Sequence, residues 1–295
     1  MIMTNIDCEG KLTLDEITLL ILKILPRKAL SRLVGALARS SLSKPLIAVF
    51  AKWYTIDVQE AELEFAQYTD LTAFFVRRLR PGLRPIAPGA TVLTSPVDGI
   101  ISESGPIVDG KLIQAKGVFY SVLELLGNDQ AAADTFSDGI FVTIYLSPQD
   151  YHRIHVPLDA KIQGASYVPG TLFPVNPFGV RAVQGLFARN ERLITYLESV
   201  AGVVALVKVG AIIVGSIKVN YAEFATSRSV SKITRWAPKQ QLSVVKGEEI
   251  GHFEFGSTVI LLFQHQRVKL QVVAGERVRC GQAIGRLCDT PNPTS

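Results

Sequence analysis

After residue 88 the chain becomes a series of short apolar runs, rich in β-branched residues and separated by glycine and proline. The most prominent runs span residues 139–146, 161–168, 203–209, 211–219, 258–263 and 269–273. Runs of this length between turn-forming residues are typical of β-strands joined by tight connections. They predict a mostly antiparallel β core, with short helices at 121–126 and 192–199.

Glycines recur near the C-terminal end of this core, at Gly275, Gly281 and Gly285, with valine and isoleucine between them. The pattern resembles the end of a lipoyl-type barrel-sandwich, and residues 246–251 repeat it weakly. Residues 275–285 contain no lysine that such a carrier domain would modify, which disfavours a simple binding module. The expected fold class is α+β: a mostly antiparallel β core with lipoyl-like barrel-sandwich features, preceded by amphipathic helices.

The N-terminal segment 12–53 has the pattern of helices interrupted at Pro26 and Pro45. Seven basic residues and no acidic residue lie between positions 17 and 56, interspersed with many leucines and isoleucines. No uncharged apolar run reaches the roughly 18–20 residues that a membrane-spanning helix needs. The pattern favours helices that lie on an anionic membrane surface. A bundle that packs on the protein's own core is the alternative, and it stays open.

Residues 57–80 are expected to be helical, and a proline- and glycine-rich connector follows at 81–88. We therefore divide the chain into an N-terminal helical, membrane-associating region, 1–80, and a β-rich catalytic core, 81–295. The first ten residues lack the basic, apolar and small-residue pattern of a secretory signal.

Composition narrows the possible partners. The net charge of +5 suits an anionic membrane or nucleic acid, but aromatic residues make up only 8% and we find no nucleic-acid motif, so no nucleic-acid partner is expected. Three cysteines without Cys-x-x-Cys spacing argue against a disulfide framework or a zinc site. With four histidines and no His-Glu-x-x-His pattern, no metal site is expected.

A Gly-Ser step at Gly256 and Ser257 precedes the apolar run 258–263. Taken alone, it is a turn that enters a strand. A serine hydroxyl can also attack the carbonyl of the preceding residue, if a base takes its proton and the backbone is bent there. Glycine suits that preceding position because it has no Cβ and tolerates unusual backbone angles. The peptide bond becomes an ester, and elimination and hydrolysis leave a ketone, a pyruvoyl group, where Ser257 had been.

Two further segments carry titratable side chains. Asp98 lies in Pro-Val-Asp-Gly at 96–99, where its carboxylate either stabilises its own turn or orients an imidazole. His152 and His155 lie in Tyr-His-Arg-Ile-His at 151–155 and titrate near neutrality, although both are also compatible with ordinary polar residues at a strand end. His252 and His265 are assigned no role.

These segments, together with Leu-Phe-Ala-Arg-Asn-Glu-Arg at 186–192 and Val-Gly-Ser-Ile at 214–217, stand in the order and at the approximate spacing of the phosphatidylserine decarboxylases. The chain resembles that family from about residue 74 to about residue 263. It departs from the family pattern at Val97, Phe255 and Pro177, where alanine, leucine and histidine are usual. The first two changes alter only volume, and the third casts doubt on a side-chain role at that position.

The resemblance implies a set of roles. His155 is the base that activates Ser257, with Asp98 behind it, and His152 assists protonation during decarboxylation. Cleavage between Gly256 and Ser257 yields a large chain, 1–256, and a small chain, 257–295, which stay together. The cofactor is the covalent pyruvoyl group formed from Ser257, and no metal is needed. Residues expected to line the substrate pocket are Tyr145, Phe173 and Asn176.

The expected reaction is decarboxylation of phosphatidylserine to phosphatidylethanolamine. The resemblance also implies a homodimer and a peripheral protein on the cytoplasmic face of a bacterial inner membrane. Two other enzyme classes remain as alternatives. One is a serine hydrolase using the same Ser/His/Asp trio, although the chain has no Gly-x-Ser-x-Gly motif. The other is a soluble pyruvoyl-dependent amino-acid decarboxylase, which the basic N-terminal helices disfavour.

Overall fold

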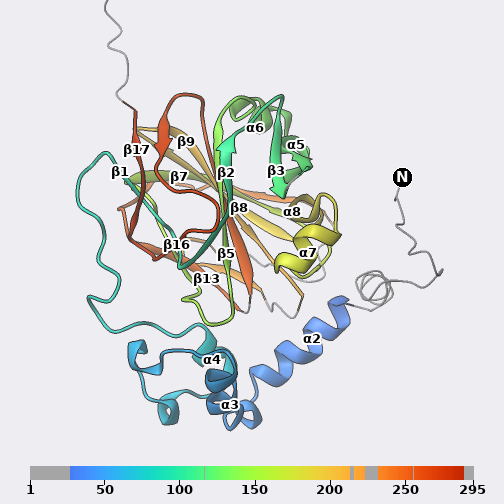
Figure 1. The fold of residues 1–295 in the computed structure, drawn as a ribbon, viewed down its shortest axis with the longest axis vertical. Coiled ribbons are helices and arrows are strands. Elements are labelled where there is room, and N and C mark those ends of the chain that lie inside the picture. The colour runs from blue at the N-terminus through green and yellow to red at the C-terminus, as the bar shows by residue number, and fades with distance from the viewer. Residues whose placement is uncertain (1–26, 116, 213–215, 223–231, 255, 289–295) are drawn as a thin grey trace, which may run out of the picture.

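The computed structural model describes residues 27–115, 117–212, 216–222, 232–254 and 256–288. Its helices are short and lie mainly at the N-terminus and along one side of a β core (Figure 1). They are α2 (Arg27–Ala38), α3 (Leu46–Trp53), α4 (Leu71–Phe75), α5 (Val122–Leu125), α6 (Gln130–Thr135), α7 (Pro177–Ala182) and α8 (Leu186–Arg189), with 3-10 turns η1 (Ser41–Ser43), η2 (Val58–Glu60) and η3 (Phe65–Gln67).

Helix α3 begins where its proline predicts, directly after Pro45. The described part of α2 begins at Arg27. Proline is tolerated at a helix start because the first N–H groups have no partner within the helix, whereas further inside it would break the hydrogen-bond ladder. The part of the predicted helical segment before residue 27 lies outside the described residues.

The expectation of a helix over 57–80 is wrong. The chain there forms η2, η3 and the five-residue α4, joined by extended segments. The carboxylates of Asp57 and Asp70 accept hydrogen bonds from the backbone N–H groups of Gln59 and Ala73, both at 2.9 Å. Such local caps start short turns and compete with a continuous helix.

In the described residues, the β core contains one large sheet and three small ones. Its strands are β1 (Val92–Thr94), β2 (Gly99–Pro106), β3 (Lys111–Ala115), β4 (Val118–Ser121), β5 (Ile140–Leu146), β6 (Arg153–His155), β7 (Ala160–Val168), β8 (Arg192–Ser199), β9 (Gly202–Val209), β10 (Ile217–Val219), β11 (Thr234–Trp236), β12 (Leu242–Val244), β13 (Glu249–Phe253), β14 (Ser257–Phe263), β15 (Val268–Leu270), β16 (Arg277–Val278) and β17 (Ala283–Leu287).

The large sheet has the order β11-β7-β8-β9-β14-β5-β2-β16, and β12 also pairs with β7. The small sheets are β1-β17-β15, β10-β13-β6 and β3-β4. Each pairing between these named strands is antiparallel, which confirms the predicted core. β14 lies in the interior of the large sheet, between β9 and β5.

The short helix predicted at 121–126 is confirmed by α5, but the one predicted at 192–199 is wrong. Residues 192–199 form β8, which pairs along its whole length with β9. Leu193, Ile194, Thr195 and Leu197 are all buried, so both faces of this strand are covered. A strand covered on both faces carries apolar residues on both, so its sequence resembles a buried helix.

The two faces of β14 contribute to different parts of the core. Val259, Leu261 and Phe263 belong to one apolar cluster, while Ile260 and Leu262 belong to a second. The second cluster also contains Ala38 of α2 and Phe75 of α4. The N-terminal helices therefore pack on the core through this cluster, as the alternative reading of segment 12–53 anticipated.

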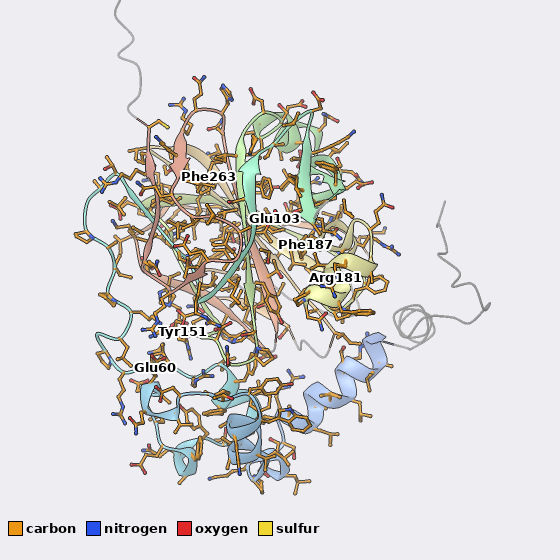
Figure 2. All side chains as sticks on the ribbon, viewed as in Figure 1. Glu60, Glu103, Tyr151, Arg181, Phe187 and Phe263 are labelled. Carbon is orange, nitrogen blue, oxygen red and sulfur yellow. The ribbon has the colours of Figure 1, made fainter. Side chains whose placement is uncertain are left out.

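In Figure 1 helices α2, α3 and α4 gather at one end of the β core. Figure 2 places Tyr151 near this end, close to Glu60, and Phe263, the last residue of β14, towards the opposite end. β14 therefore starts, at Ser257, at the end of the sheet that faces the N-terminal helices.

Candidate active site

Ser257 is the first residue of β14 and pairs with Leu146, the last residue of β5. Its side chain is 0% exposed. Among the described residues its hydroxyl has no hydrogen-bond partner. A buried hydroxyl without a partner has lost its hydration without compensation. Such a group in a native structure calls for an explanation, and a reacting group is one.

Gly256, directly before it, is not required by the fold. Its φ is outside the left-handed region, and a Cβ built on it would meet no atom of the described residues within 4 Å. The backbone thus has open space on the side of this residue where a side chain would project. Glycine here is explained better by access to the carbonyl than by packing.

A tight turn follows β5 and leads to the two predicted histidines. The Asp150 carboxylate accepts from the backbone N–H and hydroxyl of Ser147, at 2.7 and 2.6 Å, and from Arg277, at 2.7 Å. Arg77 donates to the carbonyl oxygen of Gln149 at 2.9 Å. The turn is therefore fixed from within and from the segment after α4.

His152 is fully buried next to the segment that leads to Ser257. Its carbonyl accepts from the backbone N–H of Phe253, at 3.0 Å, and its ring lies 4.1 Å, centroid to centroid, from the ring of Phe75. Nδ1 lies 2.8 Å from the carbonyl oxygen of Asp150, which can only accept, so Nδ1 carries the proton. Nε2 is then a lone pair, and it has no partner among the described residues. Burial lowers the pKa of His152 to about 3, so the imidazole is neutral.

His155 has both ring nitrogens occupied. Nδ1 lies 2.8 Å from the carbonyl oxygen of Gly247, and Nε2 lies 3.1 Å from the hydroxyl of Tyr151. Burial lowers the pKa of His155, and the hydrogen bond to Gly247 and the charges of Glu249 and Asp98 act in the opposite direction. A neutral imidazole in this environment can accept a proton.

Asp98 is held by Arg84 and by the backbone. Arg84 Nε lies 2.9 and 3.0 Å from the two carboxylate oxygens, and Nη2 lies 2.6 Å from Oδ2. The backbone N–H of Cys280 donates to Oδ1 at 2.8 Å. Arg84 also pairs with Glu60 at 2.8 Å, so one guanidinium serves two carboxylates. Sequence reasoning missed Arg84, because nothing in the sequence singles out one arginine of many.

The structure brings the predicted catalytic residues to one end of the sheet without joining them. The backbone N–H of His155 donates to the carbonyl oxygen of Pro96, at 2.8 Å, which places the Asp98 turn beside β6. In the described part of the chain, no hydrogen bond links the side chains of Asp98, His155 and Ser257 to one another. Their predicted roles therefore stay predictions.

The predicted pocket residues lie in different environments. Tyr145 is opposite Thr258, one position from Ser257. Phe173 is held by Asn190, which is 0% exposed and exchanges hydrogen bonds with both backbone groups of Phe173, each at 2.9 Å. Asn176 caps α7 through Gly179, at 3.0 Å, and Pro177 is the first residue of that helix, where proline is favoured.

A cavity of about 660 Å³ lies elsewhere, over α5, α8 and the start of β8, and none of the predicted catalytic residues lines it. Among the described residues, no cluster of histidine, cysteine, aspartate or glutamate is arranged to hold a metal ion.

Comparison with known proteins gives a consistent result. The sequence profile of the family described as phosphatidylserine decarboxylase matches residues 71–286. Two relatives, each named phosphatidylserine decarboxylase proenzyme, are 46% identical: one from Anaeromyxobacter sp. (strain K) over 282 residues, and one from Myxococcus xanthus over 278. Each alignment covers 92% of this chain and 98% of the relative. A proenzyme of the same name from Brevibacillus brevis is 44% identical over 88% of this chain and 94% of its own length. The match by profile and by full-length relatives shows that this chain belongs to the phosphatidylserine decarboxylase family.

Proposed function

We propose that this chain decarboxylates phosphatidylserine to phosphatidylethanolamine, using a pyruvoyl group that it makes from its own Ser257. One observation carries the proposal. Ser257 is fully buried at the start of an interior strand, and within the described part of the chain its hydroxyl has no partner and the glycine before it has an open side. The name proenzyme, which its relatives carry, supports maturation by cleavage.

Cleavage begins when the Ser257 hydroxyl loses its proton to a base and attacks the carbonyl carbon of Gly256. The acyl group moves from the Ser257 nitrogen to its oxygen, which converts the peptide bond into an ester. Elimination across the Cα–Cβ bond then expels the Gly256 carboxylate as the new end of the large chain. Water replaces the nitrogen of residue 257, ammonia leaves, and a ketone remains.

We assign the base to His155, with the charge of Asp98 favouring its protonated form. His155 Nε2 must leave the hydroxyl of Tyr151 to take this role, because the two lie 3.1 Å apart in the uncut chain. His155→Ala and Asp98→Asn should each block or greatly slow cleavage, which denaturing electrophoresis measures.

The surroundings of Ser257 fit a pyruvoyl group. That group supplies an electron sink on which an amine substrate can lose CO2. Ser257 itself is 0% exposed, and a dry site favours loss of CO2 from a carboxylate. We assign to His152, whose Nε2 has no partner among the described residues, the return of a proton to the substrate carbon. His152→Ala should therefore be cut but should turn over poorly.

The N-terminal helices support a lipid substrate. An apolar face is exposed along α2, η1 and α3, formed by Leu33, Leu37, Leu42, Leu46, Val49 and Trp53. Leu42 and Trp53 are 82% and 80% exposed. Exposed apolar side chains next to basic ones suit the headgroup region of an anionic bilayer. Of the helices that the structure describes, none has the length and apolarity to cross a bilayer.

We therefore propose a peripheral enzyme on the cytoplasmic face of a bacterial cell membrane. A soluble amino-acid decarboxylase would have no use for this apolar face. A serine hydrolase is also less well supported, because the chain has no Gly-x-Ser-x-Gly motif.

Intact-mass spectrometry of the purified protein tests the proposal. We expect two chains, 1–256 and 257–295, with the second lighter than a serine-ended chain by the mass of ammonia. A single uncut chain that still releases CO2 from phosphatidylserine would refute the proposal.

A further inference from the structure

The Glu254 carboxylate, three residues before Ser257, is buried and fully paired. Its side chain is 3% exposed. Oε2 lies 2.7 Å from Nη1 of Arg39 and 2.8 Å from the hydroxyl of Ser216, and Oε1 lies 2.8 Å from Nζ of Lys218. Its backbone N–H donates to the carbonyl oxygen of Ser216 at 3.0 Å. Both ends of the residue are therefore fixed.

Burial alone would raise the pKa of Glu254, but the hydrogen bonds to Lys218 and Ser216 and the charge of Arg39 outweigh it and lower the pKa. The carboxylate is thus ionised at neutral pH. Removing one partner of a buried ion pair leaves a charge that is neither hydrated nor paired. The pairing therefore resists any displacement of Glu254.

The two cations come from different parts of the chain. Lys218 belongs to β10, which pairs with β13 beside Glu254. Arg39 follows α2 directly, 215 positions away in the sequence. Its backbone continues the helix through a hydrogen bond to Gly35, at 3.2 Å, and the preceding Ala38 is buried in the apolar cluster below the sheet. The end of α2 thus reaches the segment where cleavage is proposed.

Only two residues separate Glu254 from Ser257. Ser257 is fixed on the other side by its pairing with β5. The contacts of Glu254 with Arg39, Ser216 and Lys218, which we call the Glu254 clamp, fix the backbone before the proposed cleavage site. The start of β14 fixes it after the site, and the backbone must bend between these two points for the hydroxyl to attack. Attack within this short span depends on geometry, and an error of about 1 Å in the position of reacting atoms can lower a rate about 100-fold.

We propose that Glu254 is a positioning residue for self-cleavage, and that Arg39 gives helix α2 a part in maturation by holding it. This inference rests on the proposed cleavage between Gly256 and Ser257. Neither residue touches the reacting atoms. Their effect is to hold the Gly256 carbonyl where the Ser257 hydroxyl can reach it.

The test measures cleavage rate, decarboxylation per cut molecule and melting temperature in the full-length chain. Arg39→Gln and Glu254→Gln should each slow cleavage at least about tenfold, since both release the clamp. Arg39→Lys should restore cleavage to within about threefold, because the charge remains. Arg235→Gln is the control, because it breaks a more exposed ion pair, with Asp129 at 3.3 Å, and should be cut at the wild-type rate.

A positioning role predicts that the cleavage rate changes while decarboxylation per cut molecule does not. Once cut, the Arg39→Gln protein should decarboxylate at the wild-type rate per molecule, although its melting temperature should fall below that of Arg235→Gln because the buried Glu254 carboxylate loses one of its two cations. The inference is overturned if Arg39→Gln and Glu254→Gln are cut as fast as wild type. It is also overturned if slower cleavage comes with a matching loss of melting temperature that Arg39→Lys does not rescue. If the wild-type chain itself is not cut at Gly256–Ser257, the proposed function fails first.

Discussion

Replacing Ser257 with alanine should stop cleavage and, at the same time, make the uncut protein more stable. Ser257 is 0% exposed and its hydroxyl has no partner among the described residues. An unsatisfied buried polar group costs about 1–3 kcal/mol. Alanine keeps the Cβ and removes only the oxygen, so the cavity left behind is small. The expected gain in the free energy of unfolding is therefore about 1–3 kcal/mol.

The comparison must be made between chains that are both uncut. His155→Ala supplies the background, and the double variant His155→Ala/Ser257→Ala supplies the measurement. Each kcal/mol should raise the melting temperature by about 2–4 °C in a domain of this size. Urea unfolding gives an independent value, from a shift of the midpoint at constant slope.

Two results would contradict the reasoning. If alanine lowers the stability by 1 kcal/mol or more, the hydroxyl is hydrogen-bonded in the native protein and is not held ready to react. If Ser257→Ala is still processed into two chains, the cleavage site is elsewhere. A gain in stability with no cut would support both the geometry and the chemistry.

Three further predictions follow from the same region and from the helices. Gly256→Ala should fold with an unchanged melting temperature, because its Cβ meets no atom of the described residues within 4 Å, yet cleavage should slow sharply; normal processing would show that this carbonyl needs no open side. Burial lowers the pKa of His152 to about 3, below the unfolded value of 6.5, so its contribution to stability is full above about pH 6.5 and is lost as the pH falls towards 3. In the uncut Ser257→Ala chain, His152→Asn should therefore flatten the fall in urea midpoint between pH 7 and pH 5, and an unchanged slope would contradict the burial argument. Replacing Leu42 and Trp53 together with serine should weaken binding to anionic vesicles by about tenfold per side chain, measured by co-sedimentation. Val200→Ser, which changes a side chain that is 75% exposed in the β8–β9 turn, should leave vesicle binding unchanged.

The sequence predicted those features that depend on local pattern. The start of α3 follows from Pro45, since proline is best tolerated at the beginning of a helix. The strand at 192–199 was missed because a strand buried on both faces has no alternation to read. The capping carboxylates of Asp57 and Asp70 were visible in the sequence, but their preference for short turns over a long helix was not.

Contacts between distant segments could not be predicted from the sequence pattern. The sequence singled out Asp98 and the Gly-Ser step at 256–257 by their motifs. It could not show that Arg84 would hold Asp98, or that Arg39 would reach Glu254 across 215 positions. Both are pairings of common charged residues, and only the folded chain determines which of them meet.

The position of the proposed cut explains how the product can survive it. Ser257 opens the register with β5, and the ladder runs without interruption from Ser257 opposite Leu146 to Phe263 opposite Ile140. On the other side β9 pairs with the same strand from Thr258 onwards. The broken bond lies at the first pair, so cleavage leaves the pairs from Thr258 to Phe263 in place. If the small chain left, the backbone groups of β5 and β9 that pair with β14 would lose their hydrogen-bond partners inside a buried sheet. We therefore expect the small chain to stay bound after the peptide bond is cut. Self-cleavage one residue further into β14 would sacrifice part of this ladder, and the boundary of the strand therefore favours reaction at Ser257.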